Sequence, residues 1–137
     1  MMEVNYLAVL VAAVVNMIVG FLWYGPLFGK RWTKLMGWTA ADMEAGKKTM
    51  GKTYGLTYIG AAFMAYVLSV VLNNSSATDF MSGAMVGFWI WLGFVVPVQM
   101  SEVLYGKKSW DLYYLNIGYY LVALVLMGGV LASWGGY

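Results

Sequence analysis

The stretch VNYLAVLVAAVVNMIVGFLWYGPLFG, residues 4–29, decides the fold, because it is 26 residues long and contains no charged side chain. An α-helix of about 20 apolar residues crosses the hydrocarbon core of a bilayer. Three further uncharged runs, at residues 53–78, 80–101 and 112–137, are 22 to 26 residues long. The sequence therefore predicts an all-α integral membrane protein with four transmembrane helices.

The composition agrees with a chain that is solvated mainly by lipid. Of its 137 residues, 62% are hydrophobic and only 10% are charged, whereas a soluble domain carries about 25% charged residues. We predict a single transmembrane domain over residues 1–137. Its helices are expected at about 4–24, 54–72, 80–100 and 112–131, with a polar loop at 30–52.

Two local signals refine this outline. Gly25-Pro26 should break or kink the first helix, because proline removes a backbone donor and disfavours helix at the preceding residue. Thr39 and Asp42 have the spacing of a capping box, which predicts a short helix beginning near Ala40. That helix either lies at the membrane surface or continues into the second transmembrane helix.

The basic residues predict the orientation in the membrane. All eight lysines and arginines fall within residues 30–52 and 107–108. Basic residues stay on the cytoplasmic side of a membrane protein. We therefore expect a multi-pass protein of the cell membrane, with both termini outside and both basic loops in the cytoplasm.

The residue types present argue against several function classes. The chain has no cysteine and no histidine, so the thiol nucleophile, the commonest metal ligand and the usual near-neutral proton shuttle are missing. We expect no metal site, no cofactor and no enzymatic activity, since Glu102 and Asp111 alone make too small a catalytic group. Nucleic-acid binding is not expected either, because membrane topology already accounts for the basic residues.

The two halves of the chain resemble each other. VGFLWY at 19–24 is similar to VGFWIW at 86–91, and LFGKRW at 27–32 is similar to LYGKKSW at 104–110. The matches occur in the same order and both halves would cross inward first. They indicate a parallel repeat of a two-helix hairpin, and the alternative is a chance alignment of aromatic-rich segments.

Polar residues within the helices are the candidate functional residues. At ~100° per residue, Asn5, Asn16 and Trp23 fall on one face of the first helix. Polar side chains in lipid face protein or water, so these residues either line a polar path or tie helices together. The full candidate set is Asn5, Asn16, Trp23, Tyr24, Asn116 and Tyr120. Gly83 and Gly87 form a GxxxG pair that favours close helix packing, within the chain or between copies.

The segment at 16–32, with its WYGPLFG element, resembles the first part of the domain-of-unknown-function 1761 family of small membrane proteins. The stretches Leu104-Tyr105-Gly106 and Asn116-Ile117-Gly118-Tyr119 are similar to that family's last hairpin. The resemblance covers essentially the whole chain. It implies a four-helix membrane fold and supplies no catalytic residues.

Two functions remain open from the sequence. The first is a homo-oligomeric channel or transporter for a small solute, because four short helices can hardly enclose a path alone. The second is a structural or interaction protein of the lipid bilayer, whose basic loop docks to anionic lipid or to a partner. The candidate docking residues are Lys30, Arg31, Lys34, Lys47, Lys48 and Lys52.

Overall fold

The computed structural model describes residues 4–134. Within that range, four helical segments are long and apolar enough to cross a membrane. They are Tyr6–Leu27, Met50–Asn73, Phe80–Leu104 and Trp110–Trp134. The predicted four-helix membrane architecture is therefore confirmed, and each segment extends a few residues beyond at least one of its predicted ends.

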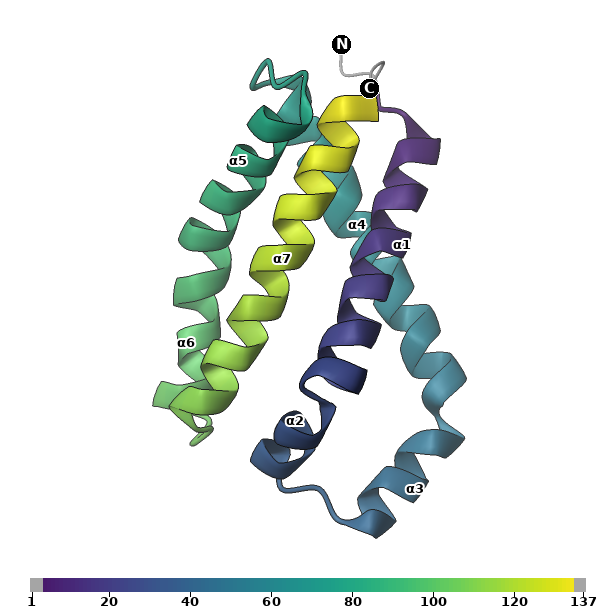
Figure 1. The fold of residues 1–137 in the computed structure, drawn as a ribbon, viewed down its shortest axis with the longest axis vertical. Helices are drawn as coiled ribbons and strands as arrows, with labels where there is room; N and C mark the ends of the chain where they lie inside the picture. The colour runs from purple at the N-terminus through teal and green to yellow at the C-terminus, as the bar shows by residue number, and fades with distance from the viewer. Residues whose placement is uncertain (1–3, 135–137) are drawn as a thin grey trace.

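The last helix, α7 (Trp110–Trp134), occupies the middle of the bundle. It packs against α1 (Tyr6–Leu22) on one side and α5 (Phe80–Ile90) on the other, and α4 (Met50–Asn73) contacts both α1 and α7. The ends of α1 and α7 that lead to the termini lie together, beside the connection from α4 to α5 (Figure 1). The remaining connections lie at the other end, which we call the basic end because it carries all eight lysines and arginines.

The first transmembrane segment bends where glycine and proline were predicted to bend it. Asn5 caps the start of α1 by accepting a hydrogen bond from the Ala8 backbone N–H over 3.1 Å. α1 passes into a π-helical segment, η1 (Trp23–Leu27), in which Gly25 has non-helical angles of φ −111° and ψ −105°. Pro26 follows directly and cannot donate a helical hydrogen bond. The chain therefore changes direction between α1 and α2.

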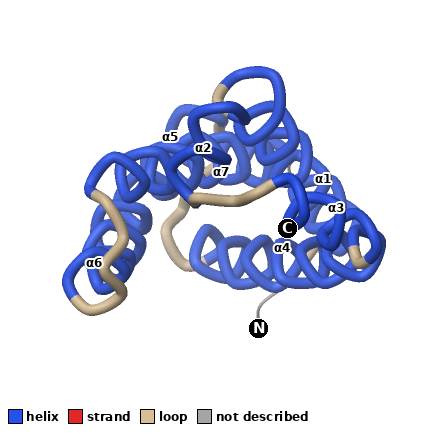
Figure 2. Tube along the Cα trace, turned by 90° about the horizontal axis from the view of Figure 1, so that it is seen from below, coloured by secondary structure: helices blue, strands red, loops and turns tan. Residues whose placement is uncertain are grey.

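The polar connection at the basic end is more helical than the sequence predicts. It contains α2 (Gly29–Met36) and α3 (Ala40–Lys48), whereas only the second was expected. The predicted capping box of α3 is present, with Thr39 and Asp42 each bonding the other's backbone N–H. Gly37 ends α2 at φ +73°, a left-handed conformation that favours glycine. Figure 2, seen from the basic end, shows this connection crossing toward α4.

Glycines allow α5 and α7 to approach each other closely. A Cβ atom added to Gly83 would lie 2.1 Å from the Gly128 carbonyl oxygen, and one added to Gly87 would lie 2.3 Å from that of Leu124. These contacts lie within the chain, so the predicted GxxxG pair packs two of its own helices. Gly55 on α4, by contrast, has no atom within 4 Å of an added Cβ.

The third transmembrane segment shares one feature with the first. After α5 it continues as a π-helical segment, η2 (Trp91–Val95), and then as α6 (Val96–Leu104). Both π-helical segments are five residues long and begin at a tryptophan. In a parallel repeat, α5 would contact α4 in the way that α1 contacts α7. The structure differs: α1 packs broadly against α7, whereas α5 makes few contacts with α4. The two hairpins are therefore not packed equivalently, and an internal repeat stays a prediction.

Candidate functional site

Two asparagine–tyrosine pairs join α1 and η1 to α7. The Tyr119 hydroxyl donates to Asn16 Oδ1 over 2.8 Å, and the Tyr24 hydroxyl donates to Asn116 Oδ1 over 2.7 Å. The rings of Tyr24 and Tyr119 lie 5.3 Å apart, so the two pairs adjoin. Asn16 is only 3% exposed and Tyr119 only 8%. We call Asn16, Tyr24, Asn116 and Tyr119 the asparagine–tyrosine cluster.

Small residues and a tryptophan fix the position of this cluster. The indole N–H of Trp23 donates to the Leu115 carbonyl over 2.9 Å. Its ring lies over Gly118, where an added Cβ would come within 2.9 Å of the indole. Gly20 leaves similar room for the Tyr119 ring, at 3.3 Å from an added Cβ. Bulkier side chains at either glycine would push α1 and α7 apart.

The structure brings together five of the six residues predicted for a polar path or helix contact. Trp23 and Tyr24 lie in η1, and Asn16 on α1 faces α7. The centre of the Tyr120 ring lies 4.8 Å from that of the Tyr119 ring. Asn5 lies apart from them, as the cap at the far end of α1. The sequence reasoning did not select Tyr119, although it lies three residues after Asn116 and so on the same face of α7.

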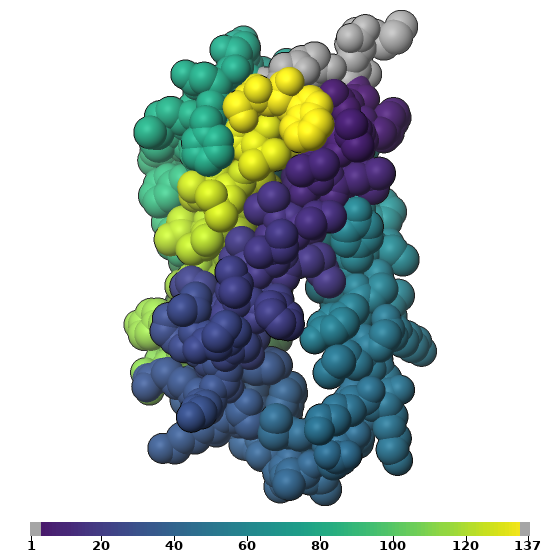
Figure 3. Space-filling model, turned by 45° about the vertical axis from the view of Figure 1, so that its right-hand side comes forward, coloured from purple at the N-terminus to yellow at the C-terminus, as the bar shows by residue number. Residues whose placement is uncertain are grey.

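A cleft of about 740 Å³ opens beside the cluster, between α1 and the half of α4 nearest the basic end. Figure 3 shows it as a gap between the purple and teal parts of the surface. Asn16 and Tyr119 line it, together with Thr53, Thr57 and Tyr58 from α4. We call it the α1–α4 cleft.

The other half of the α1–α4 contact is closed. There the buried side chains of Ala8, Ala12, Ala65 and Leu68 belong to one apolar core. The Tyr58 hydroxyl donates to the Leu10 carbonyl over 3.2 Å, at the boundary between the closed half and the cleft. The cleft therefore ends inside the membrane-spanning region, and within a single chain it does not continue to the end that carries the termini.

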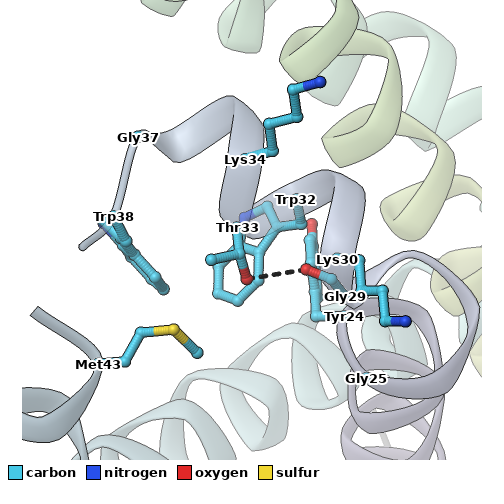
Figure 4. A pocket seen from close by; sticks show the side chains of 10 residues that line it. All are labelled: Tyr24, Gly25, Gly29, Lys30, Trp32, Thr33, Lys34, Gly37, Trp38 and Met43. Atoms are coloured by element: carbon cyan, nitrogen blue, oxygen red, sulfur yellow. Dashed lines mark hydrogen bonds between the residues drawn. The ribbon is translucent and has the colours of Figure 1, made fainter. Parts of the chain in front are cut away.

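A second hollow, of about 800 Å³, lies under α2 and α3 at the basic end (Figure 4). Tyr24, Gly25 and Trp32 line both hollows and so form their shared wall. In Figure 4, Trp38 and Met43 face each other across the second hollow, while the ammonium groups of Lys30 and Lys34 point away from it. The rings of Trp32 and Trp38 meet edge to face at 4.7 Å.

The predicted docking residues are exposed and spread over three helices. Lys30, Arg31 and Lys34 lie on α2, Lys47 and Lys48 on α3, and Lys52 on α4. Two of them form ion pairs: Arg31 with Asp111 at 3.5 Å and Lys47 with Glu44 at 3.2 Å. Exposed pairs of this kind contribute little to stability, so the basic surface stays available to water, lipid or a partner.

Comparison with known proteins assigns the chain to a family. No curated protein and no solved structure matches it. The family described as "Protein of unknown function (DUF1761)" matches residues 7–132, which include two of the four membrane-spanning helices in full, all but one to two terminal residues of the first and last, and the asparagine–tyrosine cluster. The resemblance inferred from the WYGPLFG element is therefore confirmed: the chain belongs to the DUF1761 family of proteins of unknown function.

Proposed function

We propose that this protein binds a small molecule in the α1–α4 cleft and takes part in its passage across the membrane. The observation that carries the proposal is the cleft itself, which lies beside a polar cluster inside the membrane-spanning region. Ligand sites are typically hollows of about 300–1,000 Å³ with mostly apolar walls and a few well-placed polar groups. The α1–α4 cleft has this size and this kind of wall.

We propose further that the protein works as a homo-oligomer. One chain leaves the cleft open along its side and closes it at the apolar core of α1 and α4. A second copy would supply part of the missing wall and leave an opening toward lipid. Native mass spectrometry of the full chain in lipid nanodiscs tests this step, because a species of a single copy only would contradict it.

Cysteine labelling tests whether the cleft is open to a solute, and the cysteine-free chain allows it without background. Thr57 lines the cleft, whereas Ile59, two residues further along α4, does not and is 54% exposed. We expect Thr57→Cys to react with a small, uncharged methanethiosulfonate reagent at least about tenfold faster than Ile59→Cys. Equal rates would contradict an open cleft.

A second candidate function is docking of the basic end to an anionic membrane surface or partner. It is favoured by the six exposed basic residues of α2, α3 and the start of α4. Each basic residue near an anionic surface contributes about 1 kcal/mol. Neutralising Lys47, Lys48 and Lys52 should then weaken binding of the full chain to anionic lipid, and unchanged binding would refute this candidate.

A further inference from the structure

The deep end of the α1–α4 cleft holds an amide group that is only half satisfied. Asn16 Oδ1 accepts the Tyr119 hydroxyl, but within residues 4–134 the Asn16 Nδ2 group has no hydrogen-bond acceptor. Asn16 lines the cleft and is 97% buried, as its 3% exposure shows. Among the described residues, the side-chain polar atom that is fully enclosed without a partner is Ser69 Oγ, so Asn16 Nδ2 borders the open space of the cleft rather than the sealed core. The group is therefore suited to a ligand that brings an acceptor.

The walls of the cleft carry no formal charge. Its lining consists of apolar residues, glycines, one asparagine, threonines and aromatic residues. An ion would lose hydration there without gaining a counter-charge, so the lining favours a neutral ligand. The rings in the wall are those of Phe21, Tyr24, Trp32, Tyr54, Tyr58 and Tyr119. Aromatic rings pack well on other flat rings.

The position of the cleft limits how a ligand reaches it. Asn16 lies near the middle of the span Tyr6–Leu27. Tyr24, in the shared wall at the basic end, is eight residues further, or about 12 Å along the helix axis. The cleft thus occupies roughly one leaflet of a hydrocarbon core about 30 Å thick. Ile18, Phe21 and Tyr54 line the cleft and are about half exposed or more, so it is open toward lipid.

We propose that the α1–α4 cleft binds a neutral, lipid-soluble molecule with a carbonyl oxygen on a flat ring, the chemistry of a prenylated quinone. The carbonyl oxygen accepts a hydrogen bond from Asn16 Nδ2, the ring lies among the aromatic side chains, and an apolar tail leaves toward lipid. This inference rests on the proposed function, because it names the class of molecule that the cleft takes.

Native mass spectrometry of the full chain with two probes tests this assignment. The first probe is decylubiquinone, and the second is phenyldecane, which has a ring and a ten-carbon tail but no carbonyl group. We expect Asn16→Leu to weaken decylubiquinone binding about tenfold and to leave phenyldecane binding unchanged. The proposal would be overturned if the unmodified protein and Asn16→Leu bound decylubiquinone equally well. It would also be overturned if Asn16→Leu weakened the binding of decylubiquinone and of phenyldecane by the same factor.

Variants on the lipid side of the cleft keep the test valid if Asn16→Leu fails to fold. Thr57→Trp fills the cleft from the exposed side of α4 and should abolish decylubiquinone binding, whereas the matched variant Ile59→Trp should not. Tighter binding of oleate than of decylubiquinone would overturn the assignment to a neutral ligand. Rapid labelling of Thr57→Cys without decylubiquinone binding would refute this inference alone and leave the proposed function standing.

Discussion

The contact between α5 and α7 predicts a large effect from a single added methyl group. A Cβ at Gly83 would lie 2.1 Å from the Gly128 carbonyl oxygen and 2.4 Å from the Ala132 Cβ. Ordinary contact begins at 3.4 Å, so the helices would have to separate locally by about 1.3 Å, the difference between 3.4 Å and 2.1 Å. The atom in the way at 2.1 Å belongs to the backbone and cannot rotate aside.

The expected cost follows from what is known of overpacked interiors. Adding atoms to a tightly packed site destabilises a protein by about 1–3 kcal/mol, and we expect Gly83→Ala to fall in this range. Gly60→Ala is the matched control, because an added Cβ there meets no atom within 4 Å. Alanine is the better helix former by about 1 kcal/mol, so this control should be neutral or stabilising.

Steric trapping in bicelles measures the free energy of unfolding of both variants. Gly83→Ala should unfold more readily than the unmodified protein, and Gly60→Ala should not. The reasoning would be refuted if the two variants were equally stable, because the close approach of α5 and α7 would then not exist in the membrane.

Three other predictions concern the cluster, the capping box and the topology. Tyr119→Phe removes the only hydroxyl donor to the buried amide of Asn16 among the described residues and should cost about 1 kcal/mol in the same assay; an unchanged stability would count against the pair. Hydrogen bonds from the Thr39 backbone and side chain hold the pKa of Asp42 below its ordinary value. The stabilisation of α3 by the ionised Asp42 carboxylate is present above the pKa of an aspartate in the unfolded chain, about 3.9. It is lost as the pH falls through the lower pKa that Asp42 has in the folded protein. Amide exchange in α3 should therefore accelerate below about pH 4, beyond its intrinsic pH dependence, and Asp42→Ala should remove this response. In intact cells, an impermeant maleimide should label Thr78→Cys and not Lys108→Cys; the reverse pattern would contradict the predicted orientation.

The long-range outline of the fold could be predicted because lipid imposes simple requirements. A charge inside the bilayer is costly, so four uncharged runs of sufficient length define four spans. The bend at Gly25-Pro26 and the start of α3 at Thr39 were also predictable, because each depends on a few neighbouring residues. α2 was not predicted. It has no side-chain cap at its start, and its lysines resemble those of a polar loop.

The candidate site could be predicted only in part. Asn16 and Asn116 stood out because polar side chains are rare in such spans, yet their partners lie 103 and 92 residues away along the chain. Tyr119 is one of several tyrosines in α7, and its pairing depends on how α1 and α7 are rotated against each other. The α1–α4 cleft depends on the angle between two helices, and no local pattern in the sequence specifies that angle.

A high-resolution cryo-EM map of the full chain in lipid nanodiscs tests the central claim most directly. We predict an oligomer in which the α1–α4 cleft contains non-protein density within hydrogen-bond distance of Asn16 Nδ2. The claim would be contradicted by a map in which α1 and α4 close on each other at Thr57 and the Asn16 amide is fully paired with protein groups.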